Sequence, residues 1–87
     1  MEVSFSPSFL RILHGLPPLL QEEVTEKISL FADEKNHQIL RVHKLRGRLS
    51  GCYSFSVNYH IRITFEFVGK PRRAYLLTVG DHDVYDR

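Results

Sequence analysis

Residues 52–79 read CYSFSVNYHIRITFEFVGKPRRAYLLTV, and they contain three apolar-rich runs, the first two of which alternate apolar with polar residues. Alternation with a period of two is the pattern of a half-buried β-strand. The runs are separated only by a turn at Asn58-Tyr59 and a break at residues 69–71, and connections this short join antiparallel neighbours. We therefore predict an antiparallel meander. The run at residues 75–79 is almost entirely apolar, which predicts an inner strand or one covered on both faces.

The N-terminal third of the chain follows a helical period instead. Ser6-Pro7 is a helix start, because serine accepts a free backbone N–H and proline is tolerated at the first helical position. Gly15 is a helix stop, and Pro17-Pro18 opens a second helix. The apolar residues of that second helix recur every three or four positions: Leu20, Val24, Ile28 and Phe31. The short linker predicts an antiparallel helical hairpin, and residues 2–6 alternate as a short strand does.

The sequence thus predicts an α+β fold, a single small domain over residues 1–87 in the order β-α-α-β-β-β, with a helical hairpin packed on an antiparallel sheet. The chain has 87 residues, 43% hydrophobic and 25% charged, which suits one globular domain. Its single cysteine, Cys52, excludes an internal disulfide framework and a multi-cysteine zinc site. No apolar run approaches the roughly 18–20 residues of a membrane span, and the first residues lack a signal-peptide pattern. We expect a cytoplasmic protein without membrane association.

The net charge of +2 is unevenly distributed along the chain. Residues 1–36 carry three basic and six acidic residues, a net of −3, whereas residues 37–87 carry nine basic and four acidic residues, a net of +5. The segment at residues 41–48, RVHKLRGR, alone holds four bases and a histidine. Clustered cations bind phosphate backbones through counterion release. The alternative is a solvated basic loop, which is the usual meaning of such a run.

Arg62 stands out within the second predicted strand. Alternation places it opposite the apolar face, beside Ser54 and Ser56 of the neighbouring strand. Its planar guanidinium suits phosphate oxygens. The alternative is a surface arginine paired with Glu66 or another acid.

His43 and His82 are the natural acid–base candidates, because imidazole changes its charge near neutral pH. Tyr53 or Tyr85 could stack on an RNA base. With Arg62, these groups could form a metal-free RNA-cleaving site, in which the ribose 2′-hydroxyl attacks the adjacent phosphorus. The five histidines lack the spacings of metal sites, so we expect no metal and no cofactor.

Four segments match, in order and spacing, the motifs of a known family: HKLRG at 43–47, GCYS at 51–54, HIRITFE at 60–66 and LLTVGDHDVY at 76–85. They resemble the RelE/ParE superfamily of type II toxin–antitoxin toxins, particularly its RelE/StbE branch, over essentially the whole chain. The resemblance implies a RelE/ParE-like fold and, for the RelE type, an endoribonuclease that cuts mRNA in the ribosomal A site. It also implies three partners: a cognate antitoxin, mRNA and the ribosome.

The resemblance implies roles for individual residues as well. His43 stands where YoeB-type toxins have a glutamate general base, and Arg62 falls on the strand arginine held to stabilise the phosphate. His82 falls on the C-terminal histidine of the YoeB and YafQ types, a general acid, and Tyr85 is close to the C-terminal tyrosine used by RelE. The candidate RNA-binding residues are the bases of the 41–48 segment and one aromatic residue: Arg41, Lys44, Arg46, Arg48 and Tyr53.

Two other functions remain open. A ParE-like toxin that inhibits DNA gyrase without being an enzyme would share the fold, so the fold cannot separate it from a nuclease. A relative that retains only antitoxin binding is the third possibility. The combination of His43, Arg62 and His82 favours the nuclease, because a gyrase inhibitor has no need of it.

Overall fold

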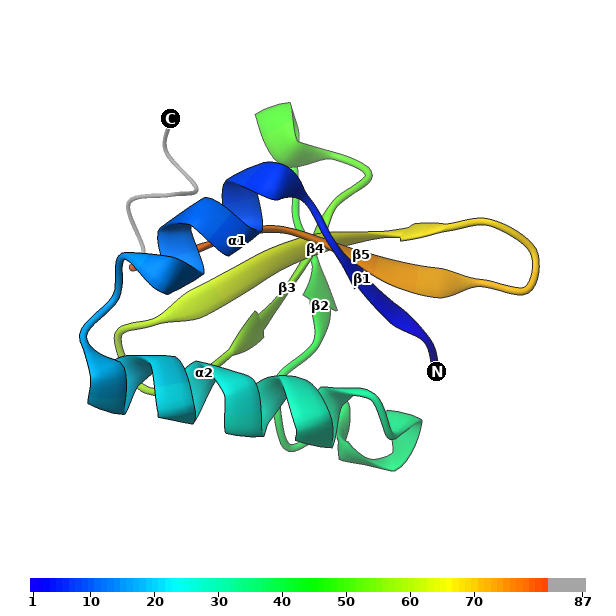
Figure 1. The fold of residues 1–87 in the computed structure, drawn as a ribbon. Coiled ribbons are helices and arrows are strands. Elements are labelled where there is room, and N and C mark those ends of the chain that lie inside the picture. The colour runs from blue at the N-terminus through cyan, green and yellow to red at the C-terminus, as the bar shows by residue number, and fades with distance from the viewer. Residues whose placement is uncertain (82–87) are drawn as a thin grey trace.

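The computed structural model describes residues 1–81 as one five-stranded sheet packed against two helices (Figure 1). The sheet order is β1-β5-β4-β3-β2. The strands are β1 (Val3–Phe5), β2 (His43–Lys44), β3 (Tyr53–Ser56), β4 (Arg62–Val68) and β5 (Arg73–Gly80), and the helices are α1 (Pro7–His14) and α2 (Pro18–Phe31). The predicted α+β class and order are confirmed, with the two-residue strand β2 added. In the described part of the chain, neither helix has the length and apolar character that crossing a bilayer requires.

The sheet is mostly antiparallel rather than wholly so, which corrects the sequence prediction. Strand β1 pairs with β5 in parallel, with Val3 opposite Ala74 and Phe5 opposite Leu76. A parallel pair cannot be joined by a tight hairpin. Here both helices and the other three strands separate β1 from β5 along the chain, so no turn constrains their relative direction.

The first helix begins and ends where the sequence predicts. The Ser6 hydroxyl accepts a hydrogen bond from the Phe9 backbone N–H at 2.9 Å, and Gly15 is the C-cap. The same hydroxyl donates to the Leu77 carbonyl oxygen at 3.1 Å, so one side chain both caps α1 and ties it to β5. Figure 1 shows α1 and α2 running in opposite directions, as expected of the hairpin.

The core is centred on Phe31, the last residue of α2. Its ring stacks on that of Phe55 with centroids 4.2 Å apart and on that of His37 at 4.8 Å, and it meets Phe65 edge-on at 4.8 Å. The three phenylalanines have no exposed surface. The buried apolar residues packed with them come from both helices, the strands and the connections: Phe9, Val24, Leu40, Val57, Ile63, Ala74, Leu76 and Val79.

A register shift in β5 explains its nearly continuous apolar sequence. Thr64 of β4 is opposite Thr78, but the next residue, Phe65, is opposite Leu76, which leaves Leu77 as an extra residue in a bulge. Leu76 and Val79 therefore both reach the core although they lie three positions apart. The prediction of an inner strand is confirmed, because β5 lies between β1 and β4.

Replacing Phe31 with alanine should remove about 3–5 kcal/mol from the free energy of unfolding, because the substitution opens a cavity between α2 and the sheet. The whole free energy of unfolding of a native protein is only about 5–15 kcal/mol. Leu30→Ala is the matched control, since the neighbouring side chain is 41% exposed and should lose far less. Urea unfolding of both variants measures the difference, and equal losses would contradict the central place of Phe31.

Candidate nucleic-acid interface

The pairing register brings His43 and Arg62 to one face of the sheet. Residues directly opposite each other in a ladder project from the same face. His43 is opposite Ser54, and Arg62 is opposite Ser56, two positions further along the same strand. As alternation predicts, this face lies opposite the one that carries Phe55 and Phe65 into the core. We call it the outer face, and its members here are His43, Ser54, Ser56, Arg62 and Thr64.

Strand geometry sets the spacing between the two candidate residues. His43 and Arg62 are separated by two strand spacings of about 4.8 Å and by a two-residue offset of about 7 Å, which puts their Cα atoms roughly 12 Å apart. A gap of that size can hold one phosphodiester group between an arginine side chain and an imidazole.

Part of the outer face is buried, which the sequence did not predict. Ser54 has no exposed surface and Thr64 is only 4% exposed. Within the described residues, the Thr64 hydroxyl has no hydrogen-bond partner, a situation that costs about 1–3 kcal/mol. The exposed part of this face lies instead around His43, with the half-buried Ser56 and Arg62 beside it.

Arg62 closes the turn between β3 and β4. Its Nη1 donates to the carbonyl oxygens of Asn58 at 2.6 Å, Tyr59 at 3.1 Å and Ile61 at 3.2 Å. The sequence pattern predicts that Arg62 binds a phosphate or pairs with Glu66 or another acid, and it does not predict these bonds to backbone carbonyl oxygens. A guanidinium has five N–H donors, and these contacts use those of Nη1, so the turn holds the positive charge in a fixed position.

A pocket of about 310 Å³ lies at this end of the sheet. It is lined by Arg41, Ser56, Asn58, Tyr59 and Arg62. The structure thereby brings together two arginines that are far apart in the sequence, Arg41 from the basic segment and Arg62 from β4. Two arginines at the lining of one concave site add positive charge there, which favours an anion.

His43 is oriented by the backbone of Arg41. Its Nδ1 lies 2.7 Å from the Arg41 carbonyl oxygen. A carbonyl oxygen only accepts, so Nδ1 carries the hydrogen and Nε2 of the neutral ring carries the lone pair. Arg41 itself has a φ of 60°, in the left-handed region that non-glycine residues seldom adopt. This turn places the Arg41 carbonyl against the His43 ring, and Arg41 also lines the pocket.

The remaining candidates fall into separate groups. Lys44 is opposite Tyr53, so both belong to the core side of the sheet. The half-buried Tyr53 ring contacts those of Phe65 at 5.6 Å and Phe67 at 4.8 Å, so it already serves in packing. Lys44 is exposed, and so are the two bases of the following loop, Arg46 and Arg48.

His82 and Tyr85 lie outside the described residues. They follow Gly80, the last residue of β5, which is opposite Arg62 in the ladder. Their proposed roles, like those of the other candidate site residues, remain predictions.

Sequence reasoning missed Tyr59 as a candidate. The sequence pattern assigns the residue only to a turn, yet it lines the same pocket as both arginines. The available signal was an aromatic residue in a polar turn, where no strand or helix buries it.

Two further features of residues 1–81 concern nucleophilic and metal chemistry. Burial and the negative charge of Glu66 raise the pKa of the Cys52 thiol, so less of it is the nucleophilic thiolate at neutral pH. Among residues 1–81, no three His, Cys, Asp or Glu side chains cluster in a way that could hold a metal ion.

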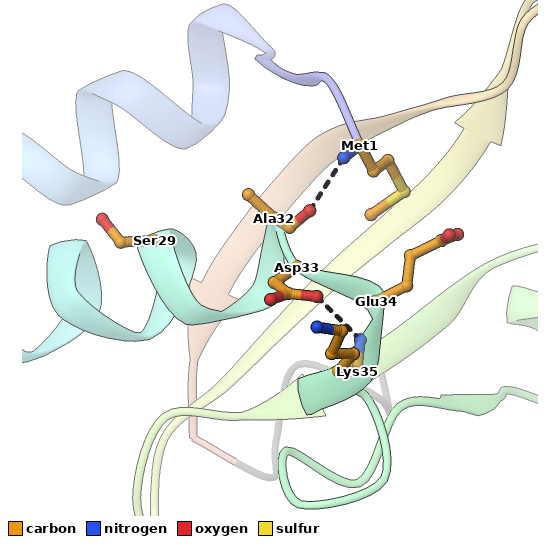
Figure 2. Close-up of a pocket in the computed structure, with 6 residues that line it drawn as sticks. All are labelled: Met1, Ser29, Ala32, Asp33, Glu34 and Lys35. Carbon is orange, nitrogen blue, oxygen red and sulfur yellow. Dashed lines mark hydrogen bonds between the residues drawn. The ribbon is translucent and has the colours of Figure 1, made fainter.

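A larger pocket, of about 600 Å³, surrounds the end of α2. Its lining includes Met1, whose amino group donates to the Ala32 carbonyl oxygen at 2.8 Å. Figure 2 shows that the side chains of Ser29, Glu34 and Lys35 point in different directions around it rather than converging on one point. This pocket contains none of the candidate residues.

The orientation of His43 is directly testable. We expect long-range ¹H–¹⁵N correlation spectra at a pH where the ring is neutral to show the hydrogen on Nδ1 and an unprotonated Nε2, because the Arg41 carbonyl needs a donor. A spectrum with the hydrogen on Nε2 would remove the exposed lone pair and, with it, the case for His43 as a base.

Comparison with known proteins places this geometry in a wider context. No family model and no curated protein matches the sequence. Solved structures do match. The RelBE2 toxin–antitoxin complex from Mycobacterium tuberculosis contains a chain with a TM-score of 0.71 and 24% identity, covering 93% of this chain and 96% of that one.

Two further structures agree over nearly the same length. The YoeB/ParE toxin from Agrobacterium tumefaciens has a TM-score of 0.68 and 14% identity, covering 94% of this chain and 99% of that one. YafQ from E. coli has a TM-score of 0.71 and 11% identity, covering 95% and 94%. At these identities the likeness concerns the fold, and this chain has the fold of the RelE, YoeB and YafQ toxins.

Proposed function

We propose that this protein is the toxin of a type II toxin–antitoxin pair and acts as a ribosome-dependent mRNA endonuclease. The observation that carries the proposal is the placement of His43 and Arg62 on one outer face, with Arg41 in contact with His43 and in the same pocket as Arg62. The fold supports it, because solved structures that share this fold include two described as toxin–antitoxin complexes, RelBE2 from Mycobacterium tuberculosis and RelBE from E. coli. A cognate antitoxin is accordingly the proposed protein partner.

The proposed chemistry is transesterification by the substrate's own ribose. Nε2 of His43 removes the proton of the 2′-hydroxyl, whose oxygen attacks the adjacent phosphorus. The guanidinium of Arg62 stabilises the negative charge that develops on the phosphorane oxygens. His82, or Tyr85 close to it, protonates the leaving 5′-oxygen. The products are a 2′,3′-cyclic phosphate and a 5′-hydroxyl, and the proton removed at one end of the reaction is balanced by the proton delivered at the other.

The charge distribution fits a nucleic-acid substrate. Residues 37–87, with a net charge of +5, contain His43 and the two arginines that line the pocket, Arg41 and Arg62. The exposed bases Lys44, Arg46 and Arg48 adjoin this site along the chain and can contact phosphates of the mRNA or the ribosome without reading sequence. Since the proposed target is translating mRNA, the proposed location is the cytoplasm.

A gyrase inhibitor is the second candidate. It is favoured by one observation, the similarity to a structure described as a YoeB/ParE toxin. That function would need no oriented imidazole, so the hydrogen bond between His43 and the Arg41 carbonyl favours the nuclease.

Mapping of mRNA 5′ ends by primer extension, after induction of the protein in cells, tests the proposal. We expect cuts at codon-phased positions for the wild-type protein. His43→Ala and His82→Ala should each lower cutting by about 10²–10⁴-fold, because each removes one proton transfer, and Arg62→Ala should also abolish most of it.

The matched control is His14→Ala, which removes an exposed histidine at the end of α1, outside the outer face. It should cut as the wild type does. Thermal unfolding of every variant separates loss of chemistry from loss of fold. Intact mRNA with accumulating DNA breaks would contradict the nuclease and favour gyrase inhibition.

A further inference from the structure

The turn between β3 and β4 presents an aromatic ring to solvent. The side chain of Tyr59 is 85% exposed, and its ring meets only the edge of His60 among the described ring contacts, at 5.1 Å and 81°. A ring with so little burial contributes little to the core. Most of the ring is therefore accessible to a stacking partner.

The backbone that carries Tyr59 is held on both sides. The Asn58 Oδ1 accepts from the backbone N–H groups of His60 at 2.8 Å and Ile61 at 2.9 Å. The Asn58 amide also donates to Glu23 Oε1 of α2 at 2.6 Å, which ties the turn to the helix. With the Arg62 bonds already described, these contacts fix the turn before any ligand arrives, and preorganisation lowers the entropic cost of binding.

The ring shares its pocket with cationic and hydroxyl groups. Arg41 and Ser56, which also line the pocket, have a guanidinium and a hydroxyl that suit phosphate oxygens, and Arg62 adds a second positive charge. The volume of about 310 Å³ is at the lower end of small-ligand sites, about 300–1,000 Å³. An aromatic platform beside a cationic groove is the arrangement by which proteins hold unpaired nucleotides.

We propose that Arg41, Ser56 and Tyr59 form a subsite for one nucleotide of single-stranded RNA. The base stacks on the Tyr59 ring, and the phosphate lies against the Arg41 guanidinium. This inference rests on the proposed function for the identity of the substrate, and it adds a positioning role: the subsite holds the nucleotide next to the phosphate that faces Arg62. An exposed aromatic ring beside a guanidinium and a hydroxyl offers partners to both the base and the phosphate of a nucleotide, whereas an acidic peptide would use only the cationic part.

Because the sequence contains no tryptophan, the fluorescence of a tryptophan introduced at the subsite reports on that site alone. Tyr59→Trp introduces a single indole at the subsite, and a short RNA oligonucleotide with 2′-O-methyl riboses serves as a ligand that the proposed chemistry cannot cut. We expect saturable quenching of the indole fluorescence. Leu19→Trp is the matched control, since Leu19 on α2 is 81% exposed and adjoins acidic residues. It should show no saturable change.

Fluorescence anisotropy of a labelled strand, measured at several salt concentrations, gives the affinity of each variant for the same oligonucleotide. Comparison of two variants of Tyr59 separates the contribution of the ring from that of its hydroxyl. Tyr59→Ala should weaken binding by about 5- to 150-fold, the range observed for loss of one stacked base. Tyr59→Phe should retain wild-type affinity. Arg41→Asn, a residue that tolerates the left-handed backbone at this position, should weaken binding and reduce its dependence on salt by about one phosphate contact.

Unchanged affinity in Tyr59→Ala, no binding by the wild-type protein, or equal quenching of both tryptophan reporters would each overturn the subsite. The same holds if Tyr59→Ala weakens binding of the antitoxin but not of RNA. Because the oligonucleotide is not cut, the outcome is independent of catalysis. Binding that depends on Tyr59 in a protein that leaves mRNA intact would support the subsite and contradict the nuclease.

Discussion

The stacking of Phe31 on Phe55 is the contact on which the rest of the molecule depends. It joins the last turn of α2 to strand β3, and His37 stacks on the same ring while its Nε2 contacts the Phe31 carbonyl oxygen at 2.9 Å. The connection that leads from α2 to Arg41 and His43 is thus attached to the core at its start. The backbone N–H of Val42 then donates to the His37 carbonyl oxygen at 3.0 Å, which continues the attachment up to the candidate base.

The same packing determines which side chains face outward. Phe55 enters the core from β3, so its neighbours Ser54 and Ser56 must point the other way. A slip of one residue in any strand would move the whole set to the opposite face. Burial of Phe55 and Phe65 therefore fixes the position of Arg62 and, through the pairing with Ser54, that of His43. The set of side chains on the outer face is therefore a consequence of packing on the inner one.

Much of this arrangement could be predicted from sequence, because it depends on local periods. The meander, both helices and the cap at Ser6 are confirmed, and alternation alone placed Arg62 opposite the core. The rest depends on contacts between distant segments. Strand β2 has two residues, too few to show a period, and the parallel pairing of β1 with β5 joins the two ends of the chain. Alternation also groups Tyr53 with Phe55, so its packing with Phe65 was accessible from the sequence, whereas the meeting of Arg41 with Arg62 and Tyr59 was not.

In the proposed reaction, an oriented imidazole and a fixed guanidinium promote attack by the ribose 2′-hydroxyl. A translation extract programmed with an mRNA that carries a single 2′-deoxy nucleotide at the mapped cut position tests it most directly. We expect no cut at that position, while the all-ribose mRNA is cut there and leaves a 2′,3′-cyclic phosphate and a 5′-hydroxyl. Cutting at the deoxy position, or products that carry a 5′-phosphate, would show that water attacks instead and would contradict the account.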